Sequence, residues 1–230
     1  MLTSDKRHYG QFCGLAAALD IIGERWTLLI VRELIIAPAR FHEIQAHLPG
    51  IGPNLLTDRL KALGARGILE AEPVPGDARG KRYRLTPIGE QLREPLLYLS
   101  RWGMRFLTED DARTGMTSSS WGFFALQAMI QGQPVPDVHE SYEFRIDEDV
   151  FHIAVTAGAA TAHRGPADQP AIVVRTSAET FVRIGAELIS PFDAVVTGGL
   201  SLEGDPAAIL RCTQLMGLSA QPIPAPSSVS

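Results

Sequence analysis

Four polar residues recur at steps of three and four within one short stretch of the chain: Asn54, Thr57, Asp58 and Lys61. In an α-helix this spacing places the four side chains on one face. An amide, a hydroxyl, a carboxylate and an ammonium together supply donors and acceptors of hydrogen bonds, which is the chemistry that contacts base edges in a major groove. Asp58 would accept a hydrogen bond from the amino group of a cytosine there, or would simply weaken binding.

The elements around these residues fit such a role. Apolar residues at helical spacing in 41–48 predict one helix, the Pro/Gly-rich segment 49–52 breaks it, and a second helix begins at Pro53. The face opposite the polar residues would be buried through Leu56, Leu60 and Leu63. This is a helix-turn-helix pattern, although a helical hairpin buried in a core would show the same leucine stripe.

A basic hairpin follows the two helices and favours the first interpretation. Residues 68–73 and 81–85 read as strands on either side of a Pro/Gly/Asp-rich turn at 74–80. Four cations gather around that turn, as expected for contacts to phosphates beside a groove-reading helix: Arg79, Lys81, Arg82 and Arg84.

Charge divides the chain into two parts. Of the 230 residues, 45% are hydrophobic, which is enough for one large core or two modest ones. Residues 1–107 contain 15 Lys/Arg and 11 Asp/Glu, a net charge of +4, whereas residues 108–230 contain 6 and 15, a net of −9, and the two add up to the total of −5. The basic character is therefore local to the first part, and an acidic total does not argue against a nucleic-acid partner.

Several motifs, in order along the chain, carry a resemblance to a known family. They are Cys13, residues 18–30 with Gly23-Glu24-Arg25-Trp26, residues 40–44, 48–51, 54–56 with 59–60, and Tyr83-Arg84-Leu85-Thr86-Pro87-Ile88-Gly89. Over about residues 10–107 the chain resembles the HxlR-type winged helix-turn-helix regulators. The resemblance implies a bacterial homodimeric transcription factor that binds double-stranded DNA. Gly52, at a position where the family often has a serine cap, and the carboxylate of Asp58 depart from the pattern.

The first cysteine has two interpretations. The surroundings of Cys13 are apolar, so it is either a small buried core residue or, as the resemblance implies for some members, a redox or electrophile sensor. Cys13 and Cys212 lie far apart and make no disulfide framework, which fits a reducing compartment. Without an apolar signal core at the start or a run of about 18 apolar residues, the expected location is cytoplasmic, with no membrane span.

A long helix is predicted from Thr86-Pro87 to about Leu107, kinked at Pro95. It carries apolar residues on two sides, so it needs two partners. One partner would be its own domain and the other the equivalent helix of a second subunit, together with the helix expected at 11–23. The alternative is that the second stripe packs on the C-terminal domain.

Periodicity changes after residue 107 and predicts a second domain of α+β class. We expect a linker at 108–119, a helix at 121–131, strands at 141–146, 150–155, 160–163 and 171–175, a helix at 177–185, a strand at 195–203, a closing helix from Asp205 to about Met216, and a disordered tail at 219–230. The domains would thus be a winged helix-turn-helix at 1–107 and an α/β sandwich-like domain at 120–218.

The order of these elements resembles the sterol carrier protein family over about residues 120–218. Residues 170–181, residues 198–205 and Ile209-Leu210 carry the likeness. It implies a mainly antiparallel sheet and an apolar cavity for a lipid or other apolar small molecule, without a catalytic group. The candidates for lining that cavity are Phe124, Met129, Phe151, Phe181, Ile184 and Leu188, although each of these residues also suits an ordinary core.

The residues favour a regulator over an enzyme. His139, His152 and His163 have no evident nucleophile nearby, and neither a zinc spacing nor a glycine-rich phosphate loop occurs, so no cofactor and no metal are expected. The sequence predicts a dimeric DNA-binding regulator whose C-terminal domain binds an apolar effector. The alternative is a lipid-binding or carrier protein that uses the winged helix only for dimerisation.

Overall fold

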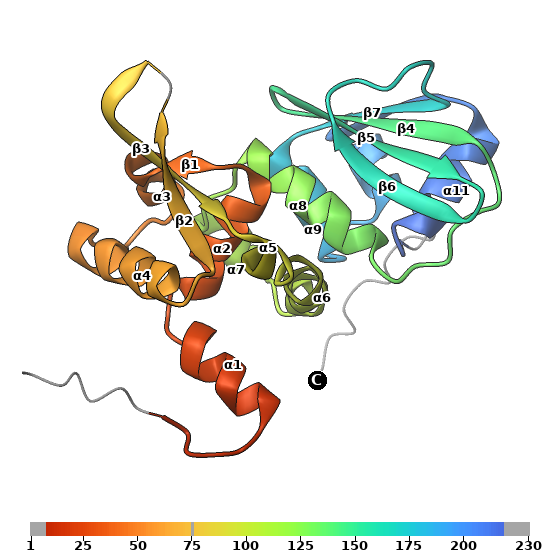
Figure 1. Ribbon diagram of the computed structural model, residues 1–230. Coiled ribbons are helices and arrows are strands. Elements are labelled where there is room, and N and C mark those ends of the chain that lie inside the picture. Colours follow the sequence, from red (N-terminus) through yellow and green to blue (C-terminus); the bar gives the residue numbers. More distant parts are fainter. Residues whose placement is uncertain (1–7, 75, 219–230) are drawn as a thin grey trace, which may run out of the picture. The chain divides into compact units, whose positions relative to one another are not determined.

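The chain separates into two compact units, one up to Leu96 and one from Leu97 onward. The structure is a computed structural model that describes residues 8–74 and 76–218, apart from the side chains of Ala78 and Arg79 (Figure 1). The tail predicted at 219–230 lies outside the described residues. Within the described ranges, no helix combines the length and the apolar character needed to cross a bilayer.

The N-terminal unit contains helices followed by an antiparallel hairpin. Its elements are α1 (Gly14–Ile22), α2 (Thr27–Ile36), β1 (Ala39–Arg40), α3 (Phe41–Ala46), α4 (Pro53–Ala65), β2 (Leu69–Val74), β3 (Asp77–Leu85) and α5 (Pro87–Glu90). The strands form an antiparallel sheet in the order β1-β3-β2. The helix pair α3–α4 and the β2–β3 hairpin make this unit a winged helix-turn-helix, as predicted, with β1 as an additional short strand (Figure 1).

The predicted leucine stripe holds α4 in the core of this unit. Leu56, Leu60 and Leu63 are all buried, as is Ile30 of α2 in the same unit. Burying three leucines against a shared core stabilises the helix far more than its intrinsic propensity does. The opposite face of α4 is consequently left for solvent or a partner.

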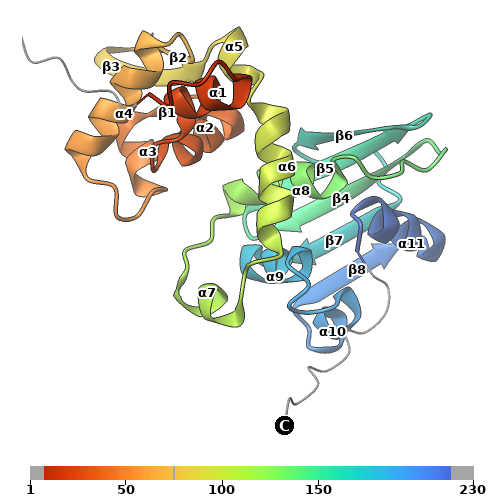
Figure 2. The same cartoon turned by 90° about the horizontal axis from the view of Figure 1, so that it is seen from below.

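The long helix predicted from residue 86, with a kink at Pro95, is instead two helices separated by residues 91–92. The helix α5 ends at Glu90 and α6 runs from Arg93 to Met104 (Figure 2). Proline has no N–H to donate to the carbonyl four residues earlier, and its ring clashes with that carbonyl. The break therefore falls before Pro95, at Gln91–Leu92, and the proline lies in the first turn of α6, where the missing donor has no cost.

The C-terminal unit is built on one mixed sheet. Its strands are β4 (Glu140–Ile146), β5 (Asp149–Thr156), β6 (Ala159–Arg164), β7 (Ile172–Thr176) and β8 (Leu200–Gly204), in the order β6-β5-β4-β7-β8. Among the described strands, β4 and β7 pair in parallel and the other pairs are antiparallel. The mainly antiparallel sheet of the prediction is therefore present.

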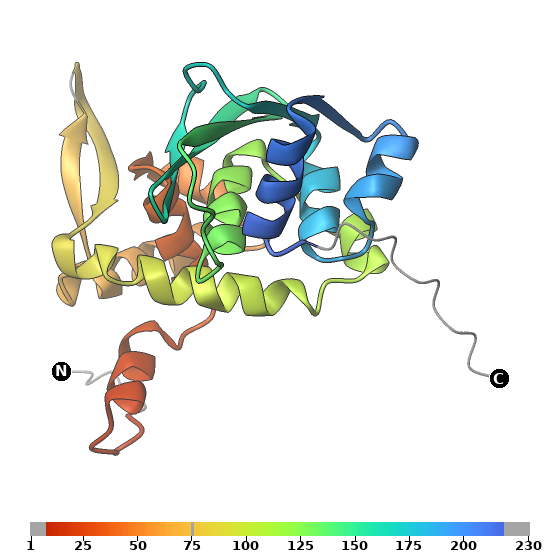
Figure 3. The same ribbon diagram turned by 90° about the vertical axis from the view of Figure 1, so that its right-hand side faces the viewer.

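Helices cover one face of this sheet, which gives a two-layer α+β arrangement (Figure 3). The helices of the unit after α6 are α7 (Glu109–Thr114), α8 (Ser119–Ile130), α9 (Ala178–Gly185), α10 (Pro191–Val196) and α11 (Pro206–Leu215). Alternating residues of the strands, such as Tyr142 and Phe144, point into the core beneath the helices and are fully or almost fully buried. On the other face of the sheet, the rings of His152 and His163 stack across β5 and β6 with centroids 5.1 Å apart.

Two segments differ from expectation because of helix caps. The segment 108–119, expected as a linker, contains α7, whose first turn is closed by reciprocal hydrogen bonds between Thr108 and Asp111. The strand expected to start at Val195 is wrong in its first half, because residues 191–196 form α10. The Ser190 hydroxyl accepts a 3.0 Å hydrogen bond from the N–H of Asp193 and Pro191 occupies the first turn, which together favour a helix.

Candidate nucleic-acid interface and apolar pocket

The outer face of α4 carries the residues predicted to contact bases. Asn54, Asp58 and Lys61 are exposed, whereas Thr57 is half-buried. The hydroxyl of Thr57 donates a 2.8 Å hydrogen bond to the carbonyl of Pro53, one turn earlier in the same helix, so it is less available to a ligand. Asn54 lies in the first turn of α4, the part of a reading helix that contacts base edges.

A side chain from α4 fixes this helix against the chain that precedes α2. The guanidinium of Arg59 donates to the carbonyl of Arg25 at 3.2 Å and to the carboxylate of Glu24 at 2.8 Å. Next to these residues, Trp26 adopts a left-handed backbone conformation, with φ of 79°. Its ring lies beside Gly50, at 3.7 Å from the position that a Cβ would take there. Arg59 thus holds α4 against residues 24–25, and the Trp26 ring lies beside the turn at Gly50.

A buried carboxylate connects α2 with the end of α3. Glu33 is only 4% exposed, and its carboxylate accepts hydrogen bonds from Arg32 at 2.9 and 2.6 Å. Its second oxygen lies 2.8 Å from Nδ1 of His47, the C-cap residue of α3. A charge this deep needs such partners, so the contact positions the helix-turn-helix rather than offering a free catalytic group.

The wing is the β2–β3 hairpin, and its predicted basic residues are divided between the two faces of this hairpin. Arg82 and Arg84 lie on one face, where they form ion pairs with Glu72 and Glu70, including a contact of 3.0 Å between Arg84 Nε and Glu72 Oε2. Lys81 alternates to the other face and makes no ion pair among the described residues. These pairs offset part of the positive charge expected there. Arg79 lies on β3, and its side chain is outside the described part of the chain.

Large apolar side chains are exposed on α6 and on α1. Trp102 of α6 and Phe106, just after this helix, are 57% and 64% exposed, and their rings pack on each other with centroids 4.7 Å apart. On α1 and just before it, Leu15 and Phe12 are exposed as well. Met104 of α6, by contrast, belongs to the buried core of the C-terminal unit. The helix therefore uses one side for that core, as the alternative expectation had it, and leaves the Trp102 side open.

Cys13 is exposed and lies immediately before α1, at its N-cap. Hydrogen bonds from the backbone N–H groups of Ala16 and Leu15 hold the pKa of its thiol below the ordinary value. A lowered pKa increases the thiolate fraction, which is the reactive form. The pKa of the Cys212 thiol is shifted in the opposite direction, because complete burial raises it and keeps the thiol neutral.

The C-terminal unit contains a small apolar pocket of about 50 Å³ between the sheet and the helices α9, α10 and α11. Of the residues predicted to line a cavity, Phe181 and Ile184 do so, together with Phe144, Cys212 and Met216. The other predicted residues lie elsewhere: Met129 and Leu188 line separate pockets, and Phe124 and Phe151 are buried in the core.

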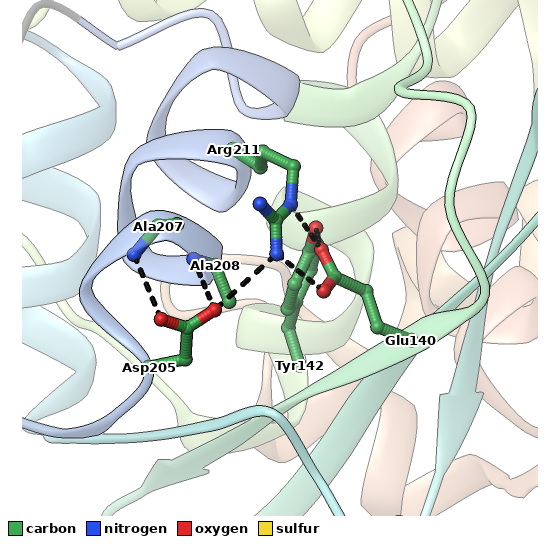
Figure 4. A network of polar contacts seen from close by, with 6 residues as sticks. All are labelled: Glu140, Tyr142, Asp205, Ala207, Ala208 and Arg211. Atoms are coloured by element: carbon green, nitrogen blue, oxygen red, sulfur yellow. Dashed lines mark hydrogen bonds and ion pairs between the residues drawn. The ribbon is translucent and has the colours of Figure 1, made fainter.

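A polar network holds α11 over this pocket (Figure 4). Arg211 of α11 donates from Nε and from a terminal nitrogen to the two carboxylate oxygens of Glu140 on β4, both at 2.7 Å, and the Tyr142 hydroxyl donates to the same carboxylate. Arg211 also lies 3.5 Å from Asp205, which caps α11 through the N–H groups of Ala207 and Ala208. No predicted site residue belongs to this network.

This network gives a pH dependence to stability. The hydrogen bond from Arg211 holds the pKa of Glu140 below its ordinary value of 4.5, helped by Tyr142 and opposed by burial. Because the pKa is lower in the folded state, the stabilisation is complete above about pH 4.5 and is lost as the pH falls through the folded-state value.

We therefore expect Glu140→Gln to lose less stability than the unmodified protein between pH 6 and pH 3, although it is less stable at pH 6. Urea denaturation at a series of pH values measures this difference. The exposed Asp168 provides a matched control, since Asp168→Asn should follow the unmodified protein. Equal acid sensitivity of Glu140→Gln and the unmodified protein would contradict the assignment.

Known proteins resemble the first part of this chain. A family model described as HxlR-like helix-turn-helix matches residues 21–111. An uncharacterised HTH-type transcriptional regulator of Mycobacterium tuberculosis (strain CDC 1551 / Oshkosh) is 36% identical over 107 residues, which cover 46% of this chain and 67% of that protein. The uncharacterised HTH-type transcriptional regulator YvaP of Bacillus subtilis (strain 168) is 34% identical over 90 residues, which cover 39% of this chain and 83% of YvaP.

One solved structure with this similarity is the reduced form of the transcriptional regulator YodB from B. subtilis. It is 31% identical, covers 42% of this chain and 95% of its own, and superposes with a TM-score of 0.37. The family model ends at residue 111, before α8 begins.

Proposed function

This chain belongs to the HxlR-like helix-turn-helix family, and we propose that it is a dimeric DNA-binding transcriptional regulator whose C-terminal unit binds an apolar effector. The observation that carries the first part is the outer face of α4. Asn54, Asp58 and Lys61 are exposed there, while the leucines of the same helix are buried in the core. A helix presented in this way, with a hairpin wing beside it, suits insertion into a major groove.

The wing would supply contacts to phosphates. Lys81 is free to make one directly, whereas Arg82 and Arg84 would exchange Glu72 and Glu70 for phosphate oxygens. That exchange costs part of the gain, since each arginine already has a partner. The wing should therefore contribute less affinity than four unpaired cations would.

The exposed apolar side of α6 supports a homodimer, with α1 as a second contributor. Trp102 and Phe106 carry large apolar surfaces that a monomer leaves in water, and Phe12 and Leu15 do the same beside α1. Exposed apolar patches of this kind mark protein interfaces. A symmetric dimer also places two reading helices on a pseudo-palindromic site.

The proposed effector site is the apolar pocket of the C-terminal unit. Its lining is almost entirely aliphatic and aromatic, which favours an apolar ligand. The two-layer arrangement with a mainly antiparallel sheet is compatible with the proposed likeness to sterol carrier proteins. Regulation follows if the ligand favours one dimer geometry over another.

Selection of duplexes from a random pool tests the DNA-binding proposal and does not require that the operator be known. We expect enrichment of a pseudo-palindromic sequence, with affinity measured by fluorescence anisotropy that survives random competitor and falls steeply with salt. Failure to enrich any sequence would contradict the regulator and favour a carrier protein that uses its winged helix only for dimerisation.

Cys13 supports a second mode of control by oxidation. It is exposed, the pKa of its thiol is lowered, and it adjoins the α1 residues proposed for the dimer interface. We expect Cys13→Ser to bind DNA like the unmodified reduced protein but to resist release by a thiol oxidant such as diamide, measured by anisotropy. The buried Cys212 gives the control, since Cys212→Ala should still be released. Release of Cys13→Ser at the unmodified rate would dispose of this role.

A further inference from the structure

A second pocket of about 270 Å³ lies in the C-terminal unit, where the ends of four helices meet. We call it the basic pocket and define it by Arg101 and Arg105 of α6 and the segment just after it, Glu187 after α9, and Met216 and Leu218 after α11. Gly217 also lines it, with φ of 69°, and a Cβ at this position would clash with the Gln133 amide and come within 3.2 Å of the Arg101 guanidinium. A glycine here therefore allows the chain to pass close to that guanidinium.

Arg101 lies in the last turn of α6 and Arg105 directly follows its last residue, and both side chains line the pocket. Arg101 donates a 2.6 Å hydrogen bond to the carbonyl of Gln131 and, with the amide of Gln133 turned to accept, to that side chain. Both of these partners are neutral. Within the described ranges neither Arg101 nor Arg105 forms an ion pair, so two positive charges face this pocket without a carboxylate bound to them.

Glu187 is the acidic residue of the same lining. Two arginines and one glutamate leave a net charge of +1, which a ligand with a single negative charge would balance. A carboxylate has that charge and accepts paired hydrogen bonds from arginine. A phosphate monoester, with nearly two negative charges at neutral pH, would leave an excess beside Glu187.

The basic pocket lies next to the apolar pocket, because Met216 and Leu218 line both. The apolar side is formed by groups such as Phe181 and Ile184, with the neutral thiol of Cys212. Met216 lines the junction, and its flexible side chain can move to widen a small cavity. A positively charged pocket therefore adjoins an apolar pocket within one unit of the chain.

We propose that the basic pocket binds the carboxylate of a small apolar monocarboxylic acid through Arg101 and Arg105, with the apolar part of the acid entering the pocket beside Met216. This proposal deepens the proposed function. It rests on that function only where it regards the acid as an effector. Binding of the acid itself is independent of DNA.

Isothermal titration of the full chain with octanoate, octan-1-ol and octylamine tests the charge requirement. Octanoate should bind at least tenfold more tightly than the alcohol, because the alcohol cannot make charge-assisted bonds to two arginines, and the amine should not bind. Arg105→Gln should weaken octanoate about tenfold and leave the alcohol unchanged. Arg113→Gln, at an exposed arginine of α7 outside both pockets, is the matched control and should bind like the unmodified protein.

Glu187→Gln supplies a test of opposite sign, since removing the competing carboxylate should tighten octanoate severalfold. Equal affinity for octanoate and the alcohol, no effect of Arg105→Gln, or no binding of octanoate at all would each overturn the proposal. The titration contains no DNA, so a failure of DNA binding by this protein leaves its outcome unaffected and the two proposals remain distinguishable.

Discussion

Replacing Trp102 by glutamate is expected to yield a monomer and to lower operator affinity by roughly a hundredfold or more, because two linked reading helices bind far more tightly than one. Trp102 is 57% exposed on α6 and packs on Phe106, so the pair forms an apolar surface ready for a second copy. A carboxylate in the centre of that interface would lose its hydration without gaining a partner.

Analytical ultracentrifugation and anisotropy on the selected operator measure the two effects of Trp102→Glu. Phe192 of α10 provides the matched control, because it is an equally exposed aromatic residue, at 58%, on another helix of the same unit. Phe192→Glu should remain dimeric and bind DNA as before. A Trp102→Glu protein that stays dimeric with unchanged operator affinity would show that α6 does not form the interface.

The helix-turn-helix could be predicted from the sequence because its determinants are local. The leucines of α4 repeat at helical spacing, and glycine at position 50 permits the φ of 94° that the turn requires. The caps at Thr86, Ser177 and Asp205 likewise act within three residues of their helix starts. Patterns that span only a few residues can be recognised in the sequence, so the bounds predicted for these helices differ from the observed bounds by only a few residues.

Features that depend on distant partners could not be predicted in the same way. The charge of Arg84 is offset by Glu70 and Glu72, a pairing that requires the register of β2 against β3. The basic pocket joins Arg101 to Gly217, more than a hundred residues later. An arginine pair at helical spacing was the available signal, but nothing in the spacing shows which chain segment faces it.

The proposed effector site and the proposed dimer interface share helix α6. Arg101 lines the basic pocket and the next residue, Trp102, is exposed on the side proposed for the partner subunit. One rigid helix therefore carries both surfaces, and a ligand that displaces Arg101 would also displace Trp102. Coupling requires that the acid bind with unequal affinity to two conformations that differ in the position of α6. The difference between these two affinities sets the size of the coupling free energy.

The second large effect is expected for a substitution on the outer face of α4. Asn54→Ala is expected to weaken binding to the selected operator by about five- to 150-fold, the range for losing one paired contact to a base, and to leave binding to random duplex unchanged. Asn54 is exposed in the first turn of α4, where its amide can donate and accept at once. Thr57→Val is the internal control, because that hydroxyl already donates to Pro53 and should matter less.

Substitutions in the wing should change the affinities for operator and random duplex in a different way from Asn54→Ala. Comparing the two variants tests which residues contact bases. Glu70→Gln combined with Glu72→Gln releases Arg82 and Arg84 for phosphates, so affinity should rise for operator and random duplex alike, with a steeper dependence on salt. Anisotropy at two salt concentrations with both duplexes separates the two patterns. If Asn54→Ala lowered both affinities equally, Asn54 would contact the backbone and α4 would not read bases through it.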